Sequence, residues 1–470
     1  MDVVIAGAGP TGLALANELA LAGVRTVVLE RLGERVEQLK GGALQPRTRE
    51  QLDMRGLHAR LAQRALRESA GGHFALLPVP LDCTPWNTRY PRPLVVPQWI
   101  VEEELQAAAE ANGAVVWRGS AVERVEQHDD HVTVHTGRET LTASWLVACD
   151  GAHSTVRRLL GLPFPGRGGT YGAALADIRL SATSETVPTA ADHISGMTQR
   201  AGDYWAMLVP LHGDEYRLTF GDNRLTDPPR TPVSHAEIEA VLHAVYGTRT
   251  RLAEVRNASR FSDATRQLTS YRHGRVLFAG DAAHIHPPLG GQGLNLGVQD
   301  AFNLGWKLAA TVQGWAPDGL LDTYQAERHP AAARVLRHTS AQRVVASPEP
   351  DTDAAALREM LTELTRLPEV NTRLAGLMSG LDLRYDLPGD HPLTGGRLPD
   401  PSGRLAPLLH RGRPVLLDGG ANVKLAHPRV ARVPFAPLDA PAVLLRPDGY
   451  VAWAGDGDPG EAAERWFGAP

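Results

Sequence analysis

A glycine-rich turn lies near the start of the chain. Its residues, Gly7-Ala-Gly-Pro-Thr-Gly12, follow the apolar run Val3–Ala6 and precede a helical pattern, Leu13–Leu21. A strand, a tight glycine turn and a helix in this order bring unpaired backbone N–H groups and the positive end of the helix dipole together, which favours binding of a pyrophosphate. Glu30 ends the next apolar run, Thr26–Leu29, at the spacing where a carboxylate accepts hydrogen bonds from an adenosine ribose. The pattern therefore predicts a dinucleotide site.

A second glycine-rich segment, Gly280–Gly297, indicates which dinucleotide binds. The apolar run Val276–Ala279 predicts a strand that leads into Asp281, and a helical pattern extends from about Leu294 to Val312. Proline and glycine dominate between them, so the backbone can approach a flat ligand while a second helix N-terminus points at it. A nicotinamide ring needs no such arrangement. A reduced flavin carries negative charge near N1 and its C2 carbonyl, which a helix N-terminus stabilises, so the two segments together favour FAD.

A third motif, Cys149-Asp-Gly-Ala-His-Ser-Thr-Val-Arg157, follows the predicted strand Trp145–Ala148. With these three motifs in this order, residues 1 to about 335 resemble the class A flavoprotein monooxygenases of the para-hydroxybenzoate hydroxylase type. Within that family the chain is most similar to actinomycete hydroxylases of aromatic polyketides and to rifamycin monooxygenases. The closer similarity continues through Leu381–Leu387 to Arg446–Trp453.

The resemblance implies roles for individual residues. Arg47 and Gln98 match an arginine and a glutamine that contact the cofactor, and Asp281 matches an acid that accepts hydrogen bonds from the ribityl chain. The backbone amides of Leu294 and Asn295 match contacts to the flavin ring. The complete set of expected cofactor-binding residues is Gly7, Gly9, Pro10, Thr11, Gly12, Glu30, Arg31, Arg47, Gln98, Asp150, Asp281, Pro288, Gly291, Gly293, Leu294 and Asn295.

Asp150 and Arg157 have two interpretations. The family's Asp-Gly motif is tied to the binding of both FAD and NADPH, whereas hydrogen bonds within the domain explain the same residues equally well. We expect Asp150 to be mainly architectural, with a contribution to the cofactor site. No second dinucleotide motif is present, so NADPH (or NADH) is expected to bind transiently at the edge of the flavin.

Five residues are candidates for the substrate cavity. Trp86, Trp205, Met207, Tyr216 and Pro288 offer the stacking surfaces that suit a flat polycyclic substrate, although ordinary core packing explains the side chains equally well. The sequence contains no Ser-His-Asp set or paired carboxylates, and no catalytic residue is assigned. That fits a reaction in which a substrate phenolate provides much of the driving force.

The composition limits the partners of the protein. The chain has 470 residues, a net charge of −5 and no basic run, which argues against nucleic acid and anionic membranes. Its two cysteines, Cys83 and Cys149, suit a reducing cytoplasm and provide no thiolate metal site. His284 and His286 lack a third soft ligand at a useful spacing, so no metal is expected. The first strand begins at Asp2, leaving no room for a signal peptide, and a homodimer is compatible with the sequence.

The positions of the motifs imply an α/β fold with a discontinuous FAD-binding domain. Alternating polar and apolar residues in Tyr204–Pro210 and Glu215–Phe220 predict antiparallel strands, which by resemblance form a sheet over the flavin. The Pro447-Asp-Gly449 turn predicts a hairpin in a small C-terminal αβ region, thioredoxin-like by resemblance and without a Cys-x-x-Cys motif. The expected division is residues 1–73, 96–163 and 264–340 for a Rossmann-like FAD-binding domain, 74–95 and 164–263 for an inserted substrate domain with the antiparallel sheet, 341–387 for a helical linker, and 388–470 for the C-terminal domain.

The resemblance implies an FAD-dependent monooxygenase that consumes NAD(P)H and dioxygen. It would hydroxylate a polycyclic aromatic substrate of polyketide type through a flavin C4a-hydroperoxide. Inactivation of a rifamycin and Baeyer–Villiger oxygenation on the same scaffold remain alternatives. More distant ones are a flavin-dependent reductase, a halogenase, whose Trp-x-Trp-x-Ile-Pro signature is absent from the sequence, and a non-catalytic flavin-binding protein.

Overall fold

A six-stranded sheet forms the centre of the molecule. The computed structural model describes residues 1–37, 41–191, 193–224, 231–347 and 352–470. The strand order is β18-β19-β10-β1-β2-β6, in which β18 is antiparallel to β19 and the other neighbours are parallel. The strands are β1 (Val3–Ala6), β2 (Thr26–Glu30), β6 (Val115–Arg118), β10 (Trp145–Ala148), β18 (Arg272–His273) and β19 (Val276–Phe278).

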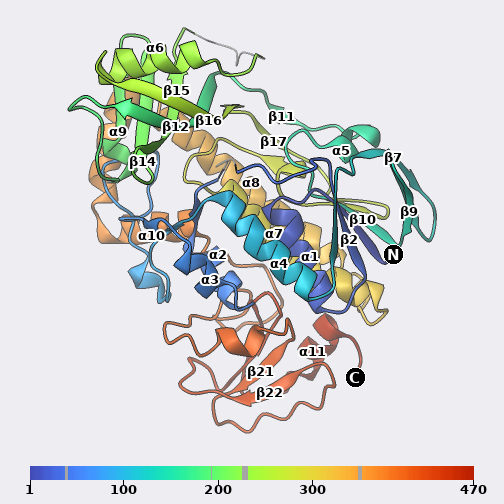
Figure 1. Ribbon diagram of the computed structural model, residues 1–470. Coiled ribbons are helices and arrows are strands. Elements are labelled where there is room, and N and C mark those ends of the chain that lie inside the picture. Colours follow the sequence, from blue (N-terminus) through green and yellow to red (C-terminus); the bar gives the residue numbers. More distant parts are fainter. Residues whose placement is uncertain (38–40, 192, 225–230, 348–351) are drawn as a thin grey trace.

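Helix α1 (Pro10–Leu21) packs between α4 (Gln98–Ala111) and α7 (Gly293–Val312), and the three cross the sheet side by side (Figure 1). Pro10 occupies the first turn of α1, where a missing N–H costs no hydrogen bond. The predicted strand–turn–helix units around both glycine-rich segments are therefore confirmed. Shorter elements complete this part of the chain: α2 (Pro46–Asp53), α3 (His58–Gln63), α5 (Thr155–Leu159), the sheet β3 (Ala43–Leu44), β5 (Leu94–Val95) and β4 (Arg67–Glu68), and the sheet β7 (Val122–Gln127), β8 (Val132–Thr136) and β9 (Thr140–Ala143).

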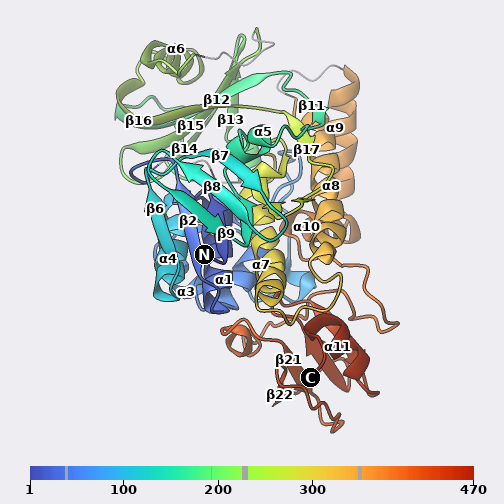
Figure 2. The same cartoon turned by 90° about the vertical axis from the view of Figure 1, so that its right-hand side faces the viewer.

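A five-stranded antiparallel sheet lies at one end of the molecule and carries α6 (His235–Tyr246) on its outer face (Figures 1 and 2). The predicted strands over Tyr204–Pro210 and Glu215–Phe220 are confirmed. The strand order is β13 (Thr198–Ala201), β14 (Tyr204–Pro210), β15 (Glu215–Asp222), β12 (Gly172–Ala182) and β16 (Arg251–Ser262). A small sheet of β11 (Gly166–Arg167), β17 (Thr265–Gln267) and β20 (His284–Ile285) connects this end to the centre.

Alternation along β15 separates the two faces of the five-stranded sheet. Tyr216, Leu218 and Phe220 are buried in a core with residues of α6. Because successive side chains of a strand point to opposite faces, Arg217 and Thr219 lie on the other, inner face. The strand register places Trp205 opposite Gly221 and Met207 opposite Thr219, so both belong to the inner face as well.

Residues 74–95 pack away from this sheet, although the sequence grouped them with the substrate domain. Leu81 and Cys83 share a core with residues of α10 (Pro368–Ser379), while Ala75 and Leu77 pack against α8 (Asp322–Val345) and α9 (Thr352–Thr365). The expected helical linker over 341–387 is present as the end of α8 together with α9 and α10. The proposed domain boundaries stay a prediction.

The C-terminal region forms a small mixed sheet at the opposite end of the molecule (Figure 2). One face packs against α11 (Gly460–Phe467) and Trp306 of α7, and the other face contacts Met54 at the end of α2. The predicted hairpin is confirmed by the pairing of β23 with β24, whereas the thioredoxin-like classification stays a prediction. The strand order is β22 (Ala431–Pro434), β21 (Val415–Asp418), β23 (Ala442–Leu445) and β24 (Val451–Gly455).

Truncating a side chain should lower the free energy of unfolding much more on the outer face of the five-stranded sheet than on its inner face. Leu218 is 0% exposed beneath α6, so Leu218→Ala should reduce the free energy of unfolding by about 2–5 kcal/mol. Thr219→Ala, its neighbour on the inner face, should change that free energy by less than about 0.5 kcal/mol. Urea unfolding followed by circular dichroism compares the two variants. Equal losses would contradict the assignment of the faces.

Candidate active site

The three sequence motifs meet at the carboxyl ends of the central strands. The Thr11 side chain lies between two glycines of the second motif: a Cβ on Gly280 would be 2.6 Å from Thr11 Oγ1, and one on Gly297 would be 2.2 Å from it. A Cβ on Gly7 would be 2.4 Å from the carbonyl oxygen of Cys149 in the third motif. The predicted convergence on one site is therefore confirmed by backbone contacts that only glycine permits.

The first turn has the shape that a pyrophosphate requires. A Cβ on Gly12 would lie 2.0 Å from the Gly7 carbonyl oxygen, whereas a Cβ on Gly9 would meet no protein atom within 4 Å. Gly12 thus serves helix–strand packing, and the open space at Gly9 lets a ligand approach the backbone. Glu30 accepts hydrogen bonds from the amides of Ala8 (2.9 Å) and Leu32 (2.9 Å), which holds its carboxylate beside the turn. Arg31 follows it and is exposed.

The N-terminus of α7 faces the same region. The helix begins at Gly293, so the first amides, including those of Leu294 and Asn295, have no acceptor within the helix. The Asn295 side chain fixes this end, accepting from the amide of Gln45 (2.7 Å) and donating to the carbonyl of Gly291 (2.8 Å). A Cβ on Gly41 would lie 3.2 Å from Gln98 Oε1 and 3.4 Å from Leu294, so two residues predicted to contact the flavin adjoin one glycine.

Asp281 is exposed at the end of β19, directly after Gly280. A Cβ on Gly293 would lie 3.9 Å from Asp281 Oδ1 and 3.8 Å from His286 Nε2, so both side chains border the N-terminus of α7. His286 donates through Nδ1 to the Pro287 carbonyl, which can only accept. Burial lowers the pKa of the imidazole to about 4, so the ring is neutral. Pro288, in the loop that follows, is exposed.

Asp150 and Arg157 connect the third motif to its surroundings. Asp150 Oδ2 accepts from the amides of Thr155 (2.7 Å) and Val156 (3.0 Å) at the start of α5, while its buried Oδ1 has no partner among the described residues. Arg157 donates to the carbonyl of Ala282 (3.0 Å), one residue after Asp281. Both side chains thus have the structural role that the sequence allowed, and the unpaired oxygen leaves Asp150 able to contact a ligand.

The assignment of Arg47 to the cofactor stays a prediction, since the contacts of its side chain in the described residues are with protein groups. Its side chain is 0% exposed and enclosed by protein groups. The guanidinium donates to Glu50 (2.9 Å) and to the carbonyl of Asp448 (3.1 Å), and it lies 4.7 Å from the ring centroid of Tyr450. Arg47 therefore joins α2 to the C-terminal hairpin, while its buried Nε has no hydrogen-bond partner among the described residues.

The inner face of the five-stranded sheet brings together only part of the predicted substrate set. Trp205 and Met207 lie on it, and Arg217 on the same face places Nη1 3.9 Å from the position of a Cβ on Gly42. The sequence places Tyr216 in the substrate cavity, whereas in the structure it packs in the core beneath α6, on the opposite face of the sheet. Trp86 lies elsewhere, packed on α10 with its indole N–H donating to the Thr372 carbonyl (2.8 Å).

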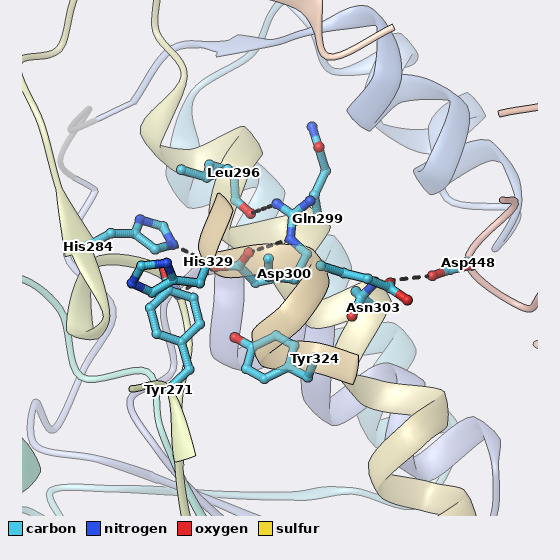
Figure 3. Close-up of polar contacts among 12 residues, drawn as sticks. Tyr271, His284, Leu296, Gln299, Asp300, Asn303, Tyr324, His329 and Asp448 are labelled. Atoms are coloured by element: carbon cyan, nitrogen blue, oxygen red, sulfur yellow. Dashed lines mark hydrogen bonds and ion pairs between the residues drawn. The ribbon is translucent and has the colours of Figure 1, made fainter. Parts of the chain in front are cut away.

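A buried ionic network behind the site was not predicted. Asp300 Oδ2 accepts from the Gly280 amide (3.1 Å) and lies 2.7 Å from His284 Nε2, and its Oδ1 accepts from Arg328 (2.7 Å) (Figure 3). Asp300, His284 and Arg328 have side chains that are 0% exposed. Burial raises the pKa of Asp300, but Arg328 and His284 outweigh it and lower the pKa overall. The ionised carboxylate therefore holds the turn that presents Asp281.

No group of three or more His, Cys, Asp or Glu side chains in the described ranges is arranged to hold a metal ion. Across the same part of the chain, no helix is both long and apolar enough to cross a membrane.

Comparison with known proteins identifies the family. A family model for an FAD-binding domain matches residues 1–339, and a model for the C-terminal region of aromatic-ring hydroxylases matches residues 391–470. The chain belongs to the FAD-binding aromatic-ring hydroxylases. The open space at Gly9, the free amides of α7 and the unpaired Asp150 oxygen fit FAD, so this hydroxylase is an FAD-dependent aromatic monooxygenase.

Relatives of this hydroxylase cover it completely. A 12-dehydrotetracycline 5-monooxygenase/anhydrotetracycline 6-monooxygenase from Streptomyces rimosus is 45% identical over 100% of this chain and 99% of the relative. A rifampicin monooxygenase from Streptomyces venezuelae is 42% identical with the same coverage of each chain. Among solved structures, an anhydrotetracycline hydroxylase from Streptomyces rimosus superposes with a TM-score of 0.88 at 44% identity, covering 100% of this chain and 99% of the other.

The different surroundings of two glycines predict separable effects. Gly9→Ala adds a Cβ that meets no protein atom within 4 Å, so the apoprotein should unfold at the wild-type temperature while FAD binds at least about tenfold more weakly, a loss of about 1.4 kcal/mol. Gly12→Ala forces a Cβ against the Gly7 carbonyl and should lower the unfolding temperature itself. Flavin-fluorescence titration and thermal unfolding measure the two effects. Wild-type FAD affinity in folded Gly9→Ala would refute the pyrophosphate assignment.

Proposed function

We propose that this hydroxylase adds one oxygen atom from dioxygen to a tetracyclic aromatic polyketide, with NADPH or NADH as the reductant. The names of two relatives, 45% and 44% identical, support a phenolic substrate related to anhydrotetracycline. We further infer a cytoplasmic location, since Cys83 and Cys149 are both buried free thiols. The identity of the reductant and a homodimeric assembly stay predictions.

The observation that carries the proposal is the composition of the inner sheet face. Trp205 and Met207 on β14 supply apolar surface, and Thr219 on β15 adds a small side chain beside them. In register with Thr219, Leu175 on β12 extends the apolar strip. Large flat substrates gain affinity from such surfaces, and a sheet can offer them over the length of several fused rings.

One fixed positive charge borders this apolar strip. Arg217 donates through Nε (3.0 Å) and Nη2 (2.8 Å) to a single oxygen of Asp177, which sets the direction of the guanidinium. Burial lowers the pKa of Arg217, and Asp177 opposes that shift, so the side chain remains a cation. A cation at this place favours the ionised form of a substrate phenol or enol, the form that is more reactive toward an electrophilic oxygen.

The protein's own residues perform positioning and exclusion of water. When bound and reduced, FAD supplies the oxygen-transfer chemistry. The amides of Leu294 and Asn295 and the carboxylate of Asp281 would hold it, while the inner sheet face would orient the aromatic ring and keep water from the reacting region. No protein base is assigned, because Arg217 lowers the need for one.

The substrate class is tested by oxygen labelling. Anhydrotetracycline, a rifamycin and a simple monocyclic phenol are each incubated with the FAD-loaded enzyme, NADPH and ¹⁸O₂, followed by mass spectrometry. We expect substrate-accelerated NADPH oxidation and a product with one labelled oxygen from the tetracyclic compound. Turnover of the rifamycin alone would favour the second candidate, which the 42% identical relative supports. A product without label, or turnover without dioxygen, would exclude oxygenation.

Arg217→Met tests the role of the buried cation. The apolar stem is kept while the charge is lost, so KM for the phenolic substrate should rise by about ten- to a hundredfold, the effect of losing a charged hydrogen bond of about 1.5–3 kcal/mol. FAD affinity should stay at the wild-type value. Arg179→Met is the matched control, because Arg179 forms an exposed ion pair with Asp214 on the same sheet. A KM unchanged in Arg217→Met would remove this residue from the substrate site.

A further inference from the structure

A cluster of buried charges joins the C-terminal hairpin to helices α7 and α8. Arg446 donates to both oxygens of Glu327 (2.7 Å each) and to Asp448 (3.1 Å from Nε). Lys307 donates to Glu327 (2.9 Å), and Asn303 donates to Glu327 (2.6 Å) and to Asp448 (3.4 Å; Figure 3). Burial raises the pKa of Glu327, but Arg446 and Lys307 lower it to about 2, so the carboxylate is ionised.

The cluster extends by direct contacts to the flavin side of α7. The Arg446 guanidinium lies 5.3 Å from the ring centroid of Tyr385, and the Tyr385 hydroxyl accepts from Arg328 Nη1 (3.1 Å). Arg328 donates in turn to Asp300 (2.7 Å) and to the Leu296 carbonyl (3.3 Å). Asp300 accepts from the amide of Gly280, the residue before Asp281.

These contacts form a path from Arg446 through Tyr385, Arg328 and Asp300 to the Gly280 amide, and its side chains have little or no contact with water. The side chains of Arg446, Arg328 and Asp300 are 0% exposed, and Tyr385 is 5% exposed as a residue. Breaking a buried ion pair leaves an unpaired charge, which is far more costly than losing a surface pair. The arrangement of the hairpin and that of the Gly280–Asp281 turn are therefore fixed together.

We propose that the C-terminal hairpin, residues 446–450, is a part of the FAD site that acts at a distance: it positions the Gly280–Asp281 turn through Tyr385, Arg328 and Asp300. These three are positioning residues, and none of them contacts the cofactor. The C-terminal region thereby contributes to flavin affinity as well as to stability, independently of which substrate the enzyme takes.

Tyr385→Phe is the most selective test, because it removes only the hydroxyl that accepts from Arg328. We expect FAD to bind about three- to tenfold more weakly to the full-length apoprotein, less than the full effect of a hydrogen bond to a charged group, because the lost bond acts on the cofactor only through Arg328 and Asp300. Arg446→Met should weaken binding further. Flavin-fluorescence titration measures affinity, thermal unfolding of the same apoprotein measures stability, and titration is done well below the unfolding temperature.

A double-mutant cycle separates the path from general destabilisation. In an Asp300→Asn background, Tyr385→Phe should have little additional effect on FAD affinity, because both changes interrupt one path. Arg432→Met, which breaks a half-exposed ion pair with Asp418 in the same C-terminal sheet, is the control and should leave FAD affinity unchanged. The proposal is overturned if Tyr385→Phe and Arg446→Met bind FAD like the wild type, if Arg432→Met weakens FAD equally, or if the effects of Tyr385→Phe and Asp300→Asn are fully additive.

Discussion

The close approach of three backbone turns around Thr11 is the constraint on which the site depends. Gly280 and Gly297 leave just enough room for the threonine side chain, and Gly7 approaches the Cys149 carbonyl on the other side. With only the Thr11 side chain between them, the ends of β1, β10 and β19 and the start of α7 converge at one edge of the sheet. Two helix N-termini then point toward one region, which suits an elongated ligand with negative charge at its pyrophosphate and on its reduced ring.

Charge pairing holds this edge from behind. The ionised Asp300 faces the back of the Gly280 turn, away from solvent, and it is tolerated because Arg328 and His284 both contact it. Such a group is a weak source of net stability, since desolvation opposes the attraction, but it strongly disfavours any other arrangement of its partners. In this fold the benefit is geometric: a short turn of backbone keeps one conformation without being packed by large side chains.

The sequence predicted the local elements well, since each depends on neighbouring residues. Glycine turns, the helical pattern of α7 and the alternation in β14 and β15 are all visible in short windows. The contact of Arg47 with the Asp448 carbonyl has no local signal, because the two residues are remote in sequence. The position of Tyr216 follows from the same alternation. Tyr216, Leu218 and Phe220 share one face of β15, and that face is buried beneath α6. The roles of Asp300 and Arg328 had no local signal, because they arise only when α7 and α8 pack together.

The division of the five-stranded sheet into two faces has a consequence for the divergence of these enzymes. Residues that hold the sheet to α6 alternate with residues on the inner face, so a substitution at an inner position need not disturb the core beneath α6. Changes at the inner positions can accumulate with little loss of folding, and a new ring system can be accommodated by a few substitutions on one side of three strands. A scaffold built in this way lets related pathways acquire distinct aromatic substrates while the cofactor apparatus beneath is inherited intact.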